Sequence, residues 1–223
     1  MPRERFENEL QALKANVLEL GHTAQKAVLD SVEALRVQDL DKARELIEND
    51  RFINEKRFAL ENEAITLIAT QQPVAGDLRI LAGVLELVTE MERIADYAKG
   101  IAIIAVMNGK EPLIKPLVDI PRMAAKAADM LHRALDAFAR KDVDLARAIP
   151  REDAEVDALY DKIYKELVGY IMQNPKNIDQ ATRLTWVAHN LERVADRVGN
   201  ICERVVFSVT GIIEELAGPP EAM

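Results

Sequence analysis

The sequence has little of what defines several common protein classes. Among 223 residues there is one cysteine, Cys202, which excludes a disulfide framework and a cysteine-ligated zinc site. Aromatic residues make up 4%, and glycine and proline number nine each, too few for the strands and turns of an all-β fold. No apolar run is long enough to cross a bilayer, and the first ten residues lack the apolar core of a signal peptide. These absences favour a cytoplasmic protein with no membrane span.

Positive charge and catalytic motifs are scarce as well. Lysine and arginine number 29 against 38 aspartates and glutamates, and the net charge of −9 argues against binding to nucleic acid. Three histidines are present, and none lies in an E-x-x-H or H-E-x-x-H motif of a di-iron or zinc enzyme. Glycine-rich phosphate loops and the G-x-S-x-G motif are also missing, which argues against nucleotide and acyl-transfer chemistry.

Helical periodicity is what the chain does contain. Apolar and small residues alternate at spacings of three and four over residues 3–37, which predicts one long helix: Leu10, Leu13, Val17, Leu20, Ala24, Ala27, Ser31, Leu35. Five more helices are predicted over residues 39–70, 77–109, 121–140, 142–174 and 179–210. Asp39 or Asp41, Asp77 and Asp179 are the expected N-caps. Cys202 lies on an apolar helical stretch and is interpreted as a small buried side chain.

Two sets of matching residues indicate an internal duplication. Ala34, Asp39 and Asp50 recur 103 residues later as Ala137, Asp142 and Asp153, and the segment 92–96 recurs 100 residues later as 192–196. We therefore predict an all-α fold of two tandem, pseudo-repeated antiparallel three-helix bundles with six long helices, each bundle with its own core. The predicted boundaries are 1–110 for the first bundle, 111–120 for a linker, 121–213 for the second bundle and 214–223 for a C-terminal tail.

The repeated E-x-x-x-D segment is the strongest candidate for a site. Glu92 and Asp96 are one helical turn apart, where two like charges destabilise a helix, and Glu192 and Asp196 repeat this arrangement. Both pairs lie beside the apolar stripe of their helix, so they are not forced into a dry core. The preceding helix of each repeat adds further oxygen ligands: Asp50 and Asn54 in the first, Asp153 and Asp157 in the second.

Oxygen ligands without thiolates suit Mg, Mn or Fe. The alternative is that these acids form ion pairs on a solvated face: with Arg93, Lys99, Arg193 and Arg197. His189 lies three residues before Glu192 and is within reach of the same helix face.

The chain resembles the PhoU family of phosphate-signalling regulators along residues 5–210. The segments that carry the resemblance are 72–79 (QPVAGDLR), 92–96 (ERIAD), 151–157 (REDAEVD) and 192–196 (ERVAD) with Asn200-Ile201. The resemblance implies two similar three-helix bundles and surface metal clusters on E(D)-x-x-x-D motifs, with iron expected and Mn, Mg or Zn as alternatives. The implied ligands are Asp50, Asn54, Glu92, Asp96, Asp153, Asp157, Glu192 and Asp196. Asn54 departs from the motif because it replaces an acid.

The resemblance also implies a function. PhoU-like proteins are non-enzymatic cytoplasmic adaptors, often homodimers, that link a PstB-like transporter ATPase to a PhoR-like sensor kinase. They repress phosphate uptake and the phosphate-starvation response. Two alternatives remain open: a carboxylate-bridged metalloenzyme, and a helical scaffold without metal. A metalloenzyme would need an open coordination position and a base, and neither a histidine nor a lysine is convincingly placed for that role.

Overall fold

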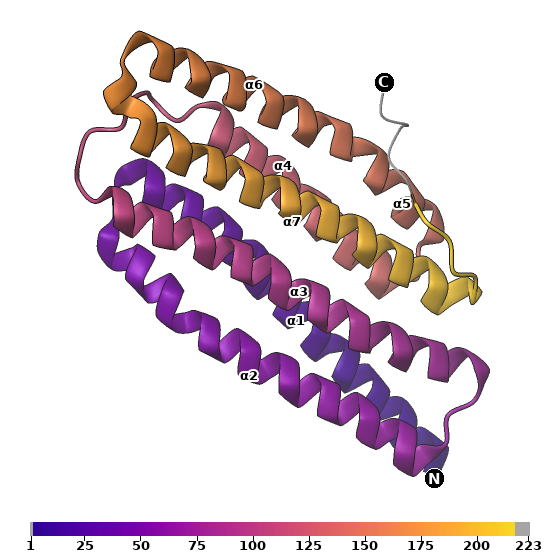
Figure 1. Ribbon diagram of the computed structural model, residues 1–223. Coiled ribbons are helices and arrows are strands. Elements are labelled where there is room, and N and C mark those ends of the chain that lie inside the picture. The colour runs from indigo at the N-terminus through magenta and orange to yellow at the C-terminus, as the bar shows by residue number, and fades with distance from the viewer. Residues whose placement is uncertain (1, 217–223) are drawn as a thin grey trace.

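The computed structural model describes residues 2–216 and confirms the all-α prediction: helices account for nearly all of these residues, and no strand occurs among them. Six long helices are present together with one short α-helix and two 3₁₀ turns (Figure 1). Their bounds are α1 Pro2–Val37, α2 Leu40–Gln71, α3 Ala75–Asn108, α4 Asp119–Arg140, α5 Val143–Ala148, η1 Ile149–Glu152, α6 Asp153–Gln173, η2 Pro175–Asn177 and α7 Ile178–Thr210. No helix in this part of the chain is long and apolar enough to span a membrane.

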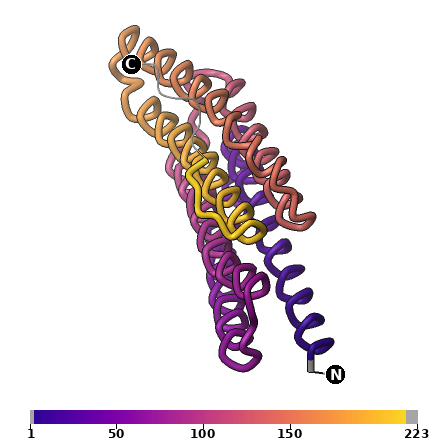
Figure 2. The backbone as a smooth tube through the Cα atoms, turned by 90° about the vertical axis from the view of Figure 1, so that its right-hand side faces the viewer, coloured from indigo at the N-terminus to yellow at the C-terminus, as the bar shows by residue number. Residues whose placement is uncertain are grey.

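The helices form an elongated bundle of two halves. Helices α1, α2 and α3 make the first half, and α4 to α7 make the second (Figures 1 and 2). The two halves meet where α3 packs along α7 and α1 packs along α4. Helices α2 and α6 therefore lie on the outer sides of the molecule, each packed against the central helix of its own half.

The turn after the first helix of each half is built in the same way. Asp39 and Asp142 are N-caps whose Oδ1 atoms accept hydrogen bonds of 2.9 Å from the backbone N–H groups of Lys42 and Leu145. The residue before each cap, Gln38 or Lys141, has a positive φ of 56° or 58°. The same cap geometry at the same 103-residue offset is what a duplicated helical hairpin should show.

The buried side chains of the two halves form one continuous core, which differs from the expectation of two separate cores. The reason is that α1 and α3 bury a second face against α4 and α7. At one close approach, a Cβ added to Gly21 of α1 would lie 2.5 Å from Cδ2 of Leu135 of α4. The division into separately folding units at the predicted boundaries stays a prediction.

Several local predictions need correction. The helix predicted over 142–174 is broken into α5, η1 and α6, because Pro150 cannot donate a backbone hydrogen bond within a helix. Helices α3 and α7 begin before Asp77 and Asp179, which lie in the first turn and are not the caps. On α1, Val28 is buried where Ala27 was expected, since a straight helix drifts relative to a seven-residue repeat. Most of the predicted tail, residues 217–223, lies outside the described residues.

Candidate metal centres

The first group of predicted ligands lies between α2 and α3. Asp50 and Asn54 are one turn apart on α2, and Glu92 and Asp96 are one turn apart on α3. The two helices run antiparallel and pack together, which brings the four side chains to one side of the first half. Asp50 is buried, with 6% of its surface exposed, whereas Asp96 is exposed and Asn54 and Glu92 are half-buried.

A lysine joins the acids of this first cluster. Nζ of Lys99 lies 2.7 Å from Oδ2 of Asp50 and 3.7 Å from Oδ1 of Asp96. Nδ2 of Asn54 donates to the same Asp50 oxygen at 3.1 Å. Burial raises the pKa of Glu92 and of Asp96, and in both cases the charge of Asp50 raises it further. Lys99 opposes this effect at Asp96, so the first cluster is partly neutralised by the chain itself.

The second group lies between α6 and α7. Asp153 and Asp157 come from the first two turns of α6, and Glu192 and Asp196 come from α7. Asp196 accepts a hydrogen bond of 2.8 Å from Nη1 of Arg193. Nδ1 of His189 lies 3.0 Å from Oε2 of Glu192, as the spacing of three residues predicts.

Asp153 is a strongly perturbed acid of this second cluster. Its Oδ1 is buried and has no hydrogen-bond partner. Burial raises the pKa of Asp153 to about 7, and the charges of Asp157, Asp196 and Glu192 add to the effect. Burial is the main cause of this shift, and the neighbouring carboxylates add negative charge that a bound cation would offset.

The predicted ligands therefore fall into two clusters, each drawn from two helices. Within residues 2–216, however, no three acidic, histidine or cysteine side chains are already arranged to hold a metal ion. The ion-pair alternative accounts for part of each cluster, through Lys99 in the first and Arg193 in the second. Metal binding at these residues stays a prediction.

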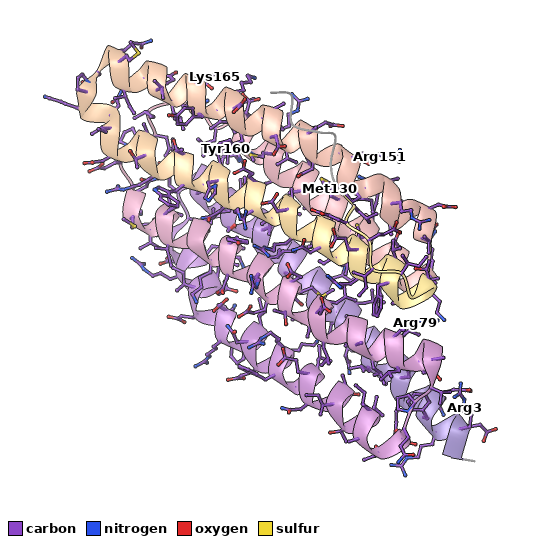
Figure 3. All side chains as sticks on the ribbon, turned by 45° about the vertical axis from the view of Figure 1, so that its right-hand side comes forward. Arg3, Arg79, Met130, Arg151, Tyr160 and Lys165 are labelled. Atoms are coloured by element: carbon purple, nitrogen blue, oxygen red, sulfur yellow. The ribbon has the colours of Figure 1, made fainter. Side chains whose placement is uncertain are left out.

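Aromatic side chains border the second cluster. The ring of His189 lies 5.7 Å from that of Trp186 and 6.4 Å from that of Tyr160, centroid to centroid. Tyr160, labelled in Figure 3, comes from α6 and stacks on Tyr164 of the same helix. Trp186 is exposed over 57% of its surface. Sequence reasoning missed this group, although the spacing of four between Tyr160 and Tyr164 places both on one helix face.

Sequence reasoning also missed the polar contacts that join the two halves. Nη1 of Arg197 on α7 lies 3.4 Å from Oε2 of Glu90 on α3, and Nε of Arg204 lies 2.7 Å from Oε2 of Glu86. The hydroxyl of Tyr97 on α3 is also hydrogen-bonded to side chains of α7. Burial alone would raise the pKa of its hydroxyl, but hydrogen bonds from Arg193 and Arg197 outweigh that effect and lower it. The sequence feature that could have indicated these contacts is the seven-residue spacing of Arg197 and Arg204, which places both on one face of α7.

Comparison with known proteins identifies both halves. The model of the PhoU domain matches residues 17–105 and again residues 120–205. The two matches begin 103 residues apart and end 100 residues apart, which are the two offsets found in the sequence.

Full-length relatives cover almost the whole chain. A protein of Clostridium acetobutylicum named phosphate-specific transport system accessory protein PhoU homolog is 35% identical over 95% of this chain and 97% of its own length. The phosphate-specific transport system accessory protein PhoU of Escherichia coli is 33% identical over 93% of this chain and 86% of its own length. The crystal structure of PhoU from Pseudomonas aeruginosa matches with a TM-score of 0.87 and 33% identity, covering 93% of this chain and all of that one. With two PhoU domains and this coverage, the chain belongs to the PhoU family.

Proposed function

We propose that this protein is a non-enzymatic cytoplasmic regulator of phosphate homeostasis. In this role it restrains phosphate uptake and represses the phosphate-starvation response by linking a phosphate transporter of the ABC class to its sensor kinase. The observation that carries the proposal is the double PhoU domain, together with full-length relatives named as accessory proteins of phosphate-specific transport. A second copy of the chain is expected to complete a homodimer.

The outer helices support an adaptor role. Phe58 and Ile65 lie seven residues apart on one face of α2, and each is exposed over 53% of its surface. On the second half, Tyr164 of α6 and Trp186 of α7 are both exposed. Tyr164 stacks on Tyr160, and Trp186 lies against the ring of His189. Exposed aromatic and large aliphatic side chains are typical of protein–protein contact sites. Each half thus offers its own candidate docking face, which suits a protein with two partners.

The experiment that tests this role is a deletion strain carrying a reporter of phosphate-starvation genes. Deletion should raise reporter expression in high phosphate, and a plasmid copy should restore repression. Purified protein should also retain the transporter ATPase and the sensor kinase in a pull-down. We expect Phe58→Ser and Trp186→Ser each to weaken retention of one partner, whereas Val118→Ser, an exposed linker variant, should not. Unchanged reporter expression in the deletion strain would reject the proposal.

We also propose that carboxylates of the two clusters hold metal ions, iron in the first place and Mn, Mg or Zn as alternatives. The chemistry of the ligands supports this, because carboxylate oxygens suit hard cations. The buried Oδ1 of Asp153, which has no hydrogen-bond partner, and the raised pKa of this residue fit a position where a cation would be stabilised. When bound, the metal would neutralise charge and join α6 to α7. Elemental analysis of purified protein tests it directly.

An enzymatic role is the second candidate, and the acid cluster beside His189 is the observation that favours it. His189 lies within hydrogen-bond distance of Glu192, so a candidate base is adjacent to a predicted metal ligand. Phosphatase and oxidase assays on metal-loaded protein distinguish the two functions. Phosphatase or oxidase activity that is lost in His189→Gln, while the metal content is unchanged, would favour the enzymatic role.

A further inference from the structure

A cavity of about 440 Å³ lies where the first half ends and the last helix begins. Its walls come from residues 107–111, at the end of α3 and in the loop after it, and from residues within 176–183, in η2 and the first turns of α7. These segments lie at the same end of the molecule (Figure 1). Nε2 of Gln38 donates to the backbone carbonyls of Gly109 and Glu111 and so holds the loop wall in place.

Three cations line this α3–α7 cavity: Lys110, Lys176 and Arg183. Two acids, Glu111 and Asp179, also line it, so positive charge is in slight excess here in a chain whose net charge is −9. Within residues 2–216, none of the three cations forms an ion pair, although Asp179 is one helical turn from Arg183. Their charges are therefore available to a ligand.

The side chain of Arg183 turns to the end of α3 instead of to an acid. Its Nη1 donates to the backbone carbonyl of Met107 at 3.1 Å and to Oδ1 of Asn108 at 3.3 Å. A cation stabilises the C-terminus of a helix, which explains this position. Among the residues described, Nε and Nη2 of Arg183 have no hydrogen-bond partner, so the guanidinium group keeps donors for a ligand.

Asn108 provides the observation that points to a ligand. Its side chain borders the cavity but is only 3% exposed. Because arginine can only donate, the contact with Arg183 fixes Oδ1 as the acceptor and leaves Nδ2 as the donor. This Nδ2 is buried and has no hydrogen-bond partner among the described residues. An unpaired buried donor is costly, and an acceptor atom bound in the cavity would satisfy it.

The start of α7 adds further donors on the same side. The residue at the N-cap, Asn177, makes no side-chain cap hydrogen bond, because its Nδ2 donates to the backbone carbonyl of Tyr170. The first backbone N–H groups of α7 therefore lack a capping side chain, and the positive end of the helix dipole faces this end of the molecule. Such a helix N-terminus favours an anion, in agreement with the cations and the unpaired amide of Asn108.

We propose that the α3–α7 cavity binds a phosphate group. Lys110, Lys176 and Arg183 supply the positive charge, and Nδ2 of Asn108 donates a hydrogen bond to one of the oxygens. Free inorganic phosphate and the phosphoryl group of a small monoester present the same oxygens to these donors. The bound group joins the end of α3 to the start of α7 and so links the two halves. This inference goes beyond the proposed function, which does not require phosphate to bind to this chain.

The test is a calorimetric titration of the full chain with inorganic phosphate, in which chloride keeps the ionic strength constant. We expect saturable binding, and in a parallel NMR titration the side-chain amide signals of Asn108 should shift. Lys176→Met should lower the phosphate affinity at least about fivefold, because a unit charge about 4 Å from the ligand is lost. Lys165→Met makes the same change of charge at an exposed position of α6 outside the cavity, and it should leave the affinity unchanged.

Two further variants test the sign of the electrostatic effect. Asp179→Asn removes a negative charge from the cavity and should raise the phosphate affinity at least about fivefold, a gain that misfolding cannot produce. Asn108→Asp keeps an oxygen for Arg183 but replaces the unpaired donor with a second oxygen, so phosphate binding should be lost. A thermal melt of this variant shows whether it is folded.

A titration with glycerol 3-phosphate distinguishes the two sources of the phosphate group. Tighter binding of the monoester supports the site and assigns it to an esterified phosphate, whereas tighter binding of inorganic phosphate supports it and assigns it to the free ion. Absence of saturable binding by both, or equal heats from phosphate and chloride at equal ionic strength, would overturn the inference. Equal phosphate affinity in the wild type, Lys176→Met and Asp179→Asn would also overturn it. The regulatory role is judged separately, by the reporter in the deletion strain.

Discussion

Arg133 and Glu152 form a two-pronged ion pair in which Nη1 lies 2.7 Å from Oε1 and Nη2 lies 2.6 Å from Oε2. Nζ of Lys126 lies 2.7 Å from the same carboxylate. The bond from Arg133, with help from Lys126, outweighs partial burial and lowers the pKa of Glu152 to about 2. Because Glu152 ends the turn η1, this contact ties α4 to the start of α6, where Asp153 enters the second cluster.

Replacing Glu152 should therefore destabilise the protein in a pH-dependent way. At pH 7 we expect Glu152→Gln to lower the free energy of unfolding by about 2 kcal/mol, because two cations lose a charged partner. The folded pKa lies below the unfolded value of about 4.5. The stabilisation is thus complete above that pH and is lost as the pH falls toward about 2. Urea melts at a series of pH values measure it: the gap between wild type and variant should narrow from pH 6 to pH 2.5.

Glu155→Gln is the matched control for that experiment. Glu155 also contacts Lys126, at 3.0 Å, but its side chain is largely exposed. Exposed pairs contribute little, so this variant should change stability by less than about 0.5 kcal/mol. A gap between wild type and Glu152→Gln that does not depend on pH would contradict the electrostatic explanation.

Glycine substitutions should separate close packing from helix propensity. Gly21→Ala places a Cβ 2.5 Å from Cδ2 of Leu135, which is itself buried and has little room to move, so we expect a loss of about 1–3 kcal/mol. Gly169→Ala, on α6, meets nothing within 4 Å and should stabilise the protein by about 0.5–1 kcal/mol. Thermal melts of the two variants should shift in opposite directions. A stabilised Gly21→Ala would mean that α1 and α4 do not pack as closely as described.

Removing metal should destabilise the wild-type protein. If ions link α6 to α7, a chelator should lower the melting temperature by about 5–10 °C, as expected for a ligand present at a hundredfold excess over its dissociation constant. The shift should be much smaller in protein carrying Glu192→Gln and Asp196→Asn. A chelator that leaves the wild-type melting curve unmoved would support the ion-pair alternative for these acids.

Cys202 should be inert to thiol reagents in the folded protein. Its side chain is fully buried, and burial raises the pKa of the thiol to about 12, so almost no thiolate is present at pH 8. Ellman's reagent should react only as the chain unfolds, and one equivalent should react in denaturant. Rapid reaction under native conditions would show that the α7 face carrying Cys202 opens to solvent.

The sequence by itself determined the features that depend on local periodicity. The apolar stripe of α3, the cap at Asp39 and its copy at Asp142, and the one-turn spacing of Glu92 and Asp96 all follow from neighbours three or four residues apart. The duplication was equally visible, because equivalent residues keep their types at fixed offsets. Six long helices and two clusters of acids could therefore be predicted without coordinates.

Only the tertiary structure decided which distant side chains meet. The sequence spacing predicts a contact of Lys99 with Asp96, three residues away, but not with Asp50, which lies on another helix. In the structure Lys99 contacts both acids. Nor could periodicity show that α1 and α3 bury a second face against α4 and α7, which merges the two expected cores into one. The contacts between these helices depend on how whole faces fit together, whereas the pattern that predicts each helix lies in its own residues. The two repeats carry similar acids but pair them differently, because Lys99 bridges Asp50 and Asp96 in the first and Arg193 pairs with Asp196 in the second.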